Sequence, residues 1–175
     1  MFEDYALEQP IIYKMIENQI NNDKLSHAYL IDANGYSKSL DFSIALANDI
    51  LSKCNNTEQK DNILDLKIIE SQGQWIKKNQ LEDLQIDFSK KSILGNKRIY
   101  IINEAEKLNQ SSSNSLLKFL EEPEEGIIAI LITNNINQML DTIISRCQIL
   151  KLKNKKVDYE SILEHIGNFI FNKES

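Results

Sequence analysis

Apolar residues follow two alternating spacings along the chain. Short runs of consecutive apolar residues are typical of strands covered on both faces of a sheet, whereas apolar residues three or four positions apart are typical of amphipathic helices. The runs predict five strands, at residues 27–31, 65–70, 98–102, 127–133 and 148–152. The wider spacing predicts helices at residues 10–20, 40–51, 80–88, 111–121 and 140–144, with a last helix from about residue 158.

This alternation predicts an α/β fold with a parallel five-stranded sheet flanked by helices. Residues 1–154 hold all of the strands, and residues 155–175 begin a separate helical segment. The polar residues 53–62 are predicted to form a loop. Ligands of such sheets bind beyond the carboxyl ends of the strands. We expect four polar segments to lie near that edge: residues 32–39, 103–106, 133–135 and 145–147.

The composition narrows the classes of function. With 175 residues, 42% of them hydrophobic and 26% charged, the chain is typical of a globular protein with one α/β domain. The net charge of −6 argues against a dominant surface for duplex DNA, because phosphates attract cations. No apolar run approaches the ~20 residues of a membrane span, and the first residues do not resemble a signal peptide. We therefore expect a cytoplasmic protein without membrane contact.

The loop after the first predicted strand can be compared with the phosphate-binding pattern G-x-x-x-x-G-K-[ST]. In that pattern glycines let backbone N–H groups approach the phosphates, the lysine neutralises them and the hydroxyl holds magnesium. Lys38 and Ser39 occupy the last two positions, but Asp32 and Ser37 replace the glycines, and Gly35 lies between them. The loop is either a degenerate phosphate loop, with weak binding of ATP and Mg²⁺ at most, or a connection that binds nothing.

The third predicted strand ends at a degenerate acidic motif. An ATPase of this architecture needs an aspartate for the metal and a glutamate that polarises the attacking water. Asn103 stands in the metal-holding position and Glu104 survives as a vestigial base, although Glu104 and Glu106 are also typical of surface charges at the start of a helix. After the fourth strand, Asn134 is either a sensor of a γ-phosphate or part of a turn.

Arg146, between Ser145 and Cys147, is the remaining candidate. An arginine supplied to a neighbouring subunit's nucleotide can stabilise charge on a transferring phosphoryl group, which raises the rate by ~10³–10⁵. Taken as a bare tripeptide, the segment favours a structural salt bridge instead. The two cysteines, Cys54 and Cys147, and the two histidines stand at none of the spacings typical of zinc ligands, so we expect no metal site.

The chain resembles the AAA+ domain of bacterial DNA polymerase III clamp-loader subunits, and within this family the delta-prime group most closely. The resemblance covers about residues 2–152 and rests on KLSHAYLI, KRIYIINEAEKLNQSSSNSLLKFLEEPEEG, LITNN and TIISRCQIL. It implies a RecA-like α/β domain over residues 1–154 and the beginning of a small helical lid over residues 155–175. It also implies assembly through a collar domain into a five-subunit ring, so the sequence is either truncated inside the lid or a short homologue.

The resemblance also implies roles for single residues. Arg146 matches the arginine finger that reaches the ATP site of the adjacent tau/gamma subunit, while Lys38 and Ser39 match the phosphate loop. Asn103 and Glu104 match the acidic pair, which delta-prime subunits often lack in intact form. The family usually carries a four-cysteine zinc module, of which only Cys54 remains here, so no zinc is expected.

The leading hypothesis is a non-catalytic, delta-prime-like subunit that supplies Arg146 to a neighbour during sliding-clamp loading in DNA replication. Its implied partners are the tau/gamma and delta subunits in a hetero-pentameric ring and, through that complex, the sliding clamp and primer-template DNA. One alternative is an active or weakly active ATPase of the tau/gamma kind that uses Lys38, Ser39 and Glu104. A third is a degenerate AAA+ domain in some other assembly.

Overall fold

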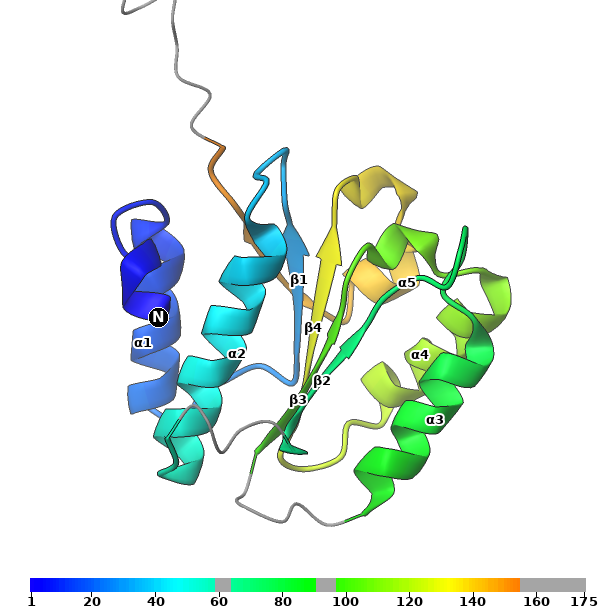
Figure 1. Ribbon diagram of the computed structural model, residues 1–175, viewed down its shortest axis with the longest axis horizontal. Coiled ribbons are helices and arrows are strands. Elements are labelled where there is room, and N and C mark those ends of the chain that lie inside the picture. The colour runs from blue at the N-terminus through cyan, green and yellow to red at the C-terminus, as the bar shows by residue number, and fades with distance from the viewer. Residues whose placement is uncertain (59–63, 91–96, 155–175) are drawn as a thin grey trace, which may run out of the picture.

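The computed structural model describes residues 1–58, 64–90 and 97–154, which form three layers with a sheet in the middle (Figure 1). All strand pairs are parallel, and the strand order is β2-β3-β4-β1-β5. The strands are β1 Ala28–Asp32, β2 Leu66–Ile69, β3 Arg98–Ile102, β4 Ile127–Thr133 and β5 Gln148–Lys151. The predicted parallel five-stranded sheet is therefore confirmed.

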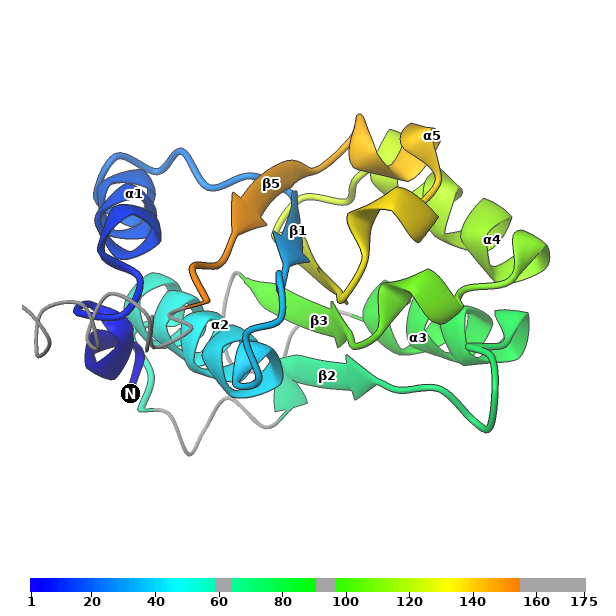
Figure 2. The same ribbon diagram turned by 90° about the horizontal axis from the view of Figure 1, so that it is seen from above.

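Helices cover both faces of the sheet (Figures 1 and 2). One face is covered by α1 Pro10–Asn21 and α2 Ser39–Asn55, together with the 3-10 helix η1 Phe2–Tyr5. The other face is covered by α3 Lys78–Ser89, α4 Gln110–Glu121 and α5 Asp141–Ile144. Two short 3-10 helices, η3 Ala105–Lys107 and η4 Ile136–Gln138, follow β3 and β4.

Strand β1 shows why the strands read as continuous apolar runs. Tyr29 and Ile31 pack on the side of α1 and α2, whereas Ala28 and Leu30 pack on the side of α3, α4 and α5, and all four are fully buried. Successive side chains of a strand point to opposite faces, so a sheet with helices on both sides needs apolar residues at every position.

Some predicted segments differ from the structure or lie outside it. Residues 53–55 belong to α2 and not to a loop, because the apolar side of that helix continues to Cys54, which packs on the core. The helix ends at Asn55, and the next residue, Asn56, has a left-handed φ of 54°, as is common after helix ends. Residues 155–175, where the lid was predicted, lie outside the described residues. Within the described ranges, no helix is long and apolar enough to cross a membrane.

Candidate functional site

Three of the four expected polar segments meet at the carboxyl edge of the sheet. Strand β4 lies between β3 and β1, so the residues that follow these strands are neighbours. Asp32 is in register with Thr133, and the Ala33 N–H donates to the Thr133 carbonyl at 2.9 Å. On the other side, the Asn103 N–H donates to the Ile69 carbonyl at 2.9 Å. The edge therefore brings together the candidate phosphate loop, the acidic motif and the candidate sensor.

The fourth segment, around Arg146, does not lie at that edge, so this expectation is wrong. It precedes β5, whose first residue Gln148 is level with Tyr29 and therefore about 10 Å short of Asp32 along the strands. Arg146 also follows α5, whereas the candidate phosphate loop leads into α2 on the opposite face of the sheet (Figures 1 and 2). Arg146 therefore lies near the opposite end of the strands from the candidate phosphate loop, and next to helices of the other face of the sheet.

The candidate phosphate loop is a tight turn in which two backbone N–H groups, of Asn34 and Tyr36, donate to acceptors within the loop. Asn34 and Gly35 have φ values of 49° and 78°, and the Tyr36 N–H donates to the Ala33 carbonyl at 2.7 Å. The Asn34 N–H donates to Oδ1 of Asp32 at 3.2 Å. In a phosphate-binding loop such N–H groups point at the anion. Here Asp32, at the position of the first glycine, accepts one of them.

The same loop is tied to the exit segment, residues 152–154, which follows β5. Asn34 Nδ2 lies 3.4 Å from the Leu152 carbonyl, and Asn154 Nδ2 donates to the Gly35 carbonyl at 3.0 Å. A Cβ atom at Gly35 would lie 2.9 Å from Asn154 Nδ2, so another residue here would displace the Asn154 side chain and would strain a backbone with φ of 78°. The one glycine retained in the loop therefore serves a contact inside the chain.

Gln9 also binds the exit segment, through the backbone of Lys153. Its side chain donates from Nε2 to the Lys153 carbonyl and accepts from the Lys153 N–H at Oε1, both at 2.9 Å. Gln9 is only 2% exposed. A buried amide that pairs with both backbone groups of one residue fixes the position of that residue. Nothing in the local sequence indicates this contact, because the two residues are 144 positions apart.

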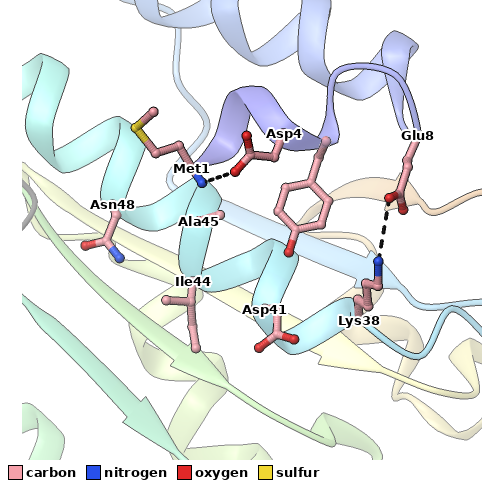
Figure 3. Close-up of a pocket in the computed structure, with 9 residues that line it drawn as sticks. Met1, Asp4, Glu8, Lys38, Asp41, Ile44, Ala45 and Asn48 are labelled. Carbon is pink, nitrogen blue, oxygen red and sulfur yellow. Dashed lines mark hydrogen bonds and ion pairs between the residues drawn. The ribbon is translucent and has the colours of Figure 1, made fainter.

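Lys38 lies beside a cavity of about 390 Å³ between η1 and α2 (Figure 3). Its Nζ is 3.7 Å from Oε1 of Glu8, and the carboxylates of Asp4 and Asp41 also line the cavity. Burial, followed by these three carboxylates, raises the pKa of the Tyr5 phenol in the same cavity. Ser39 begins α2 and is largely buried. The cavity is therefore a poor environment for phosphate, because its three carboxylates outnumber its two cations, the ammonium groups of Lys38 and Met1.

The acidic motif is also occupied by contacts within the chain. The Asn103 amide lies 3.3 Å from a Glu70 carboxylate oxygen. Glu104 adopts a left-handed backbone with φ 52° and forms an ion pair of 2.9 Å with Lys107. These partners were not predicted, since nothing in the sequence marks Glu70 or Lys107 as part of this edge.

Asn134, the candidate sensor, is bound by Glu106. Its backbone N–H and its side-chain amide donate to the Glu106 carboxylate at 3.3 and 3.2 Å. Glu106 was interpreted as a surface charge, so its contact with Asn134 was missed. Within the part of the chain that the structure describes, no group of three or more His, Cys, Asp or Glu side chains could hold a metal ion. The expectation that no zinc binds stays a prediction.

Arg146 forms an ion pair within the chain. Its Nη2 lies 2.9 Å from Oε1 of Glu121, the last residue of α4, and its Nη1 donates to the Thr142 carbonyl at 2.7 Å. One third of the arginine side chain is exposed. The salt bridge expected from the bare tripeptide is therefore present, and the role of Arg146 toward a neighbouring subunit stays a prediction.

Comparison with known proteins identifies the family. The family model described as "DNA polymerase III, delta subunit" matches residues 8–156. The chain is 39% identical over 153 residues to DNA polymerase III subunit delta' of Bacillus subtilis, which covers 81% of this chain and 46% of that protein. This chain belongs to the DNA polymerase III delta-prime family. It is thus a relative of clamp-loader subunits, as the sequence motifs predicted.

Other relatives of this delta-prime family chain include DNA polymerase III subunit gamma of Buchnera aphidicola (subsp. Baizongia pistaciae), 30% identical over 97% of this chain and 48% of that protein. The chain spans about half the length of the curated relatives it matches. Among solved structures, a gamma subunit-related protein of Thermotoga maritima superposes with a TM-score of 0.64 at 20% identity, over 85% of this chain and 49% of that one. The RuvB branch migration motor of the same organism gives 0.57 at 17% identity, over 83% and 45%. These neighbours confirm the AAA+ fold.

Proposed function

We propose that this chain is a non-catalytic subunit of the DNA polymerase III clamp loader that offers Arg146 to the ATP site of an adjacent subunit. Its proposed partners are tau/gamma and delta subunits in a five-membered ring and, through that ring, the sliding clamp and primer-template DNA in the cytoplasm. One observation carries the proposal: Arg146 lies on the opposite side of the sheet from the chain's own candidate phosphate loop. An arginine in that position is suited to a neighbour's nucleotide.

Three features of the carboxyl edge support a silent nucleotide site, that is, one that binds ATP weakly at most and does not hydrolyse it. The loop N–H groups of Asn34 and Tyr36 are used within the chain, and Lys38 faces Glu8. Asn103 replaces the aspartate that would hold the metal. Without a metal ligand at position 103, Glu104 has no positioned water to activate. The chain would therefore bind ATP weakly at most.

The proposed chemistry of Arg146 is electrostatic. A guanidinium keeps its charge at any physiological pH and presents donors in a fixed planar fork that matches phosphate oxygens. Placed against a neighbour's transferring phosphoryl group, it would stabilise the charge that develops there, while that neighbour supplies metal, water and base. Hydrolysis would then depend on correct contact between the two subunits.

The arginine proposal is tested in a reconstituted clamp loader that contains the complete subunit. Arg146→Ala is expected to lower DNA-stimulated ATP hydrolysis at the adjacent site by about 10³-fold, with unchanged folding by circular dichroism. Lys118→Ala, which removes an exposed cation from α4, is the matched control and should retain normal hydrolysis. Equal hydrolysis by the Arg146→Ala and unsubstituted loaders would refute the proposal.

The silent-site proposal is tested by calorimetric titration with ATP and Mg²⁺. No heat of binding is expected up to about 1 mM nucleotide. A variant carrying Asp32→Gly, Ser37→Gly and Asn103→Asp should gain measurable affinity, because it frees the loop and restores the metal ligand. Binding by the natural sequence that Lys38→Ala abolishes would instead favour a weakly active ATPase of the tau/gamma kind, a reading consistent with the gamma relative.

A further inference from the structure

Glu121 lies at the end of α4, where the chain turns back toward β4. The helix is capped by Asn109, whose side chain accepts the Ser112 N–H at 2.9 Å, and Pro123 follows its last turn. Proline disfavours a helical conformation in the residue before it, so α4 ends here. This fixes the Glu121 carboxylate beside Arg146, at the point where α4 and α5 pack together.

The location of Glu121 is electrostatically unusual. A carboxylate in the last turn of a helix faces the negative end of the helix dipole, whereas a cation is favourable there. Arg146 supplies that cation at 2.9 Å. Because both side chains are partly exposed to water, with exposed fractions of 49% for Glu121 and 33% for Arg146, the pair adds little to folding stability. Its effect on the geometry of the arginine is the more important one.

The guanidinium is fixed at two corners. Glu121 binds Nη2, while Nη1 reaches the Thr142 carbonyl and lies 3.5 Å from the Ser145 hydroxyl. A guanidinium has five N–H donors. These contacts, all within the described part of the chain, use three of them and leave two for an external anion. An arginine without such contacts loses much rotamer freedom when it binds an anion, whereas Arg146 is already ordered.

We propose that Glu121 is a positioning residue that orients the Arg146 guanidinium before it meets the phosphoryl group of a neighbour's nucleotide. This inference rests on the proposed function of Arg146. Glu121 does not touch the nucleotide; it removes the entropic cost of ordering the arginine at the moment of hydrolysis. Thr142 binds the guanidinium through its backbone carbonyl, which a substitution does not remove. Glu121 binds it through its side chain, so substitution can test the role of Glu121.

The test compares Glu121→Ala and Glu121→Gln in the reconstituted clamp loader. The alanine variant loses the acceptor, and kcat for DNA-stimulated hydrolysis at the adjacent site is expected to fall on the order of ten-fold, with KM for ATP unchanged. The glutamine variant keeps a carbonyl oxygen at the same place and should recover most of the activity. Glu122→Ala, which removes the next exposed carboxylate, is the matched control.

Double substitution separates this inference from the function on which it rests. In an Arg146→Ala background, Glu121→Ala should have no further effect, because its action passes through the arginine. If Arg146→Ala alone leaves hydrolysis unchanged, the proposed function fails. If Arg146→Ala lowers hydrolysis but Glu121→Ala does not, or raises it, only the positioning role is overturned. Loss of assembly or folding in Glu121→Ala that Glu121→Gln shares would likewise assign a structural role.

Discussion

Cys147 follows Arg146 directly but lies in a different environment. The arginine reaches solvent, whereas the thiol packs against the core beside α3, α4 and α5. Burial raises the pKa of Cys147 from its ordinary value of 9.0 to about 12. The same cause raises the pKa of the Tyr29 phenol to about 12. Both groups are therefore neutral in the folded protein well into the alkaline range.

This predicts a loss of stability at alkaline pH. Below about pH 9 the thiol is protonated in both states, and between about pH 9 and 12 it ionises only when the chain unfolds, so the free energy of unfolding falls as the pH rises. Urea unfolding at about pH 8 and pH 10.5 should show this decrease. Cys147→Ser should show a smaller decrease, with the remainder due to Tyr29 and to other groups whose pKa burial raises, such as Tyr36, Tyr100 and Cys54. An identical decrease in both proteins would contradict the prediction.

Residue identities at the candidate site were predictable from the sequence, but their partners were not. Lys38, Ser39 and Arg146 stand within recognisable motifs. Their contacts with Glu8 and Glu121 join residues 25 or more positions apart, with no local pattern that indicates them. Such pairs become visible only when the fold brings two segments together.

At the scale of elements, apolar spacing predicted every strand and α-helix of the described residues to within a few positions. It missed the 3-10 helices at Phe2–Tyr5, Ala105–Lys107 and Ile136–Gln138. These turns are too short to show a helical period, since a period needs several turns to repeat. Two of them begin one or two residues after the candidate residues Glu104 and Asn134, so the least predictable elements lie next to the candidate site.

The contact between Gln9 and the exit segment gives a prediction at this scale. Gln9→Ala leaves the backbone N–H and carbonyl of Lys153 without their partner, which should cost about 1–3 kcal/mol of folding stability. Thermal or urea unfolding measures this loss. Gln74→Ala, at an exposed glutamine, should cost little. Equal stability of the Gln9→Ala and natural chains would show that water replaces both hydrogen bonds.

At the scale of the whole molecule, the alternation of strands and helices predicted the fold class but not the neighbours within the sheet. Strands β1 and β4 pair although about a hundred residues separate them. Chain order alone does not determine that pairing. The expectation that Arg146 joins the carboxyl edge failed for a different reason: Arg146 precedes β5, and the segment before a parallel strand lies at the amino edge of the sheet whatever the order of the strands.

The opposite placement of Arg146 and the candidate phosphate loop gives the domain two unlike sides. In a head-to-tail assembly, every member presents one side forward and the other backward. Under the proposed function, this member completes the site of one neighbour and requires no arginine from the other. In a closed ring of similar domains it would therefore mark one position, where a site that hydrolyses ATP lies beside one that does not.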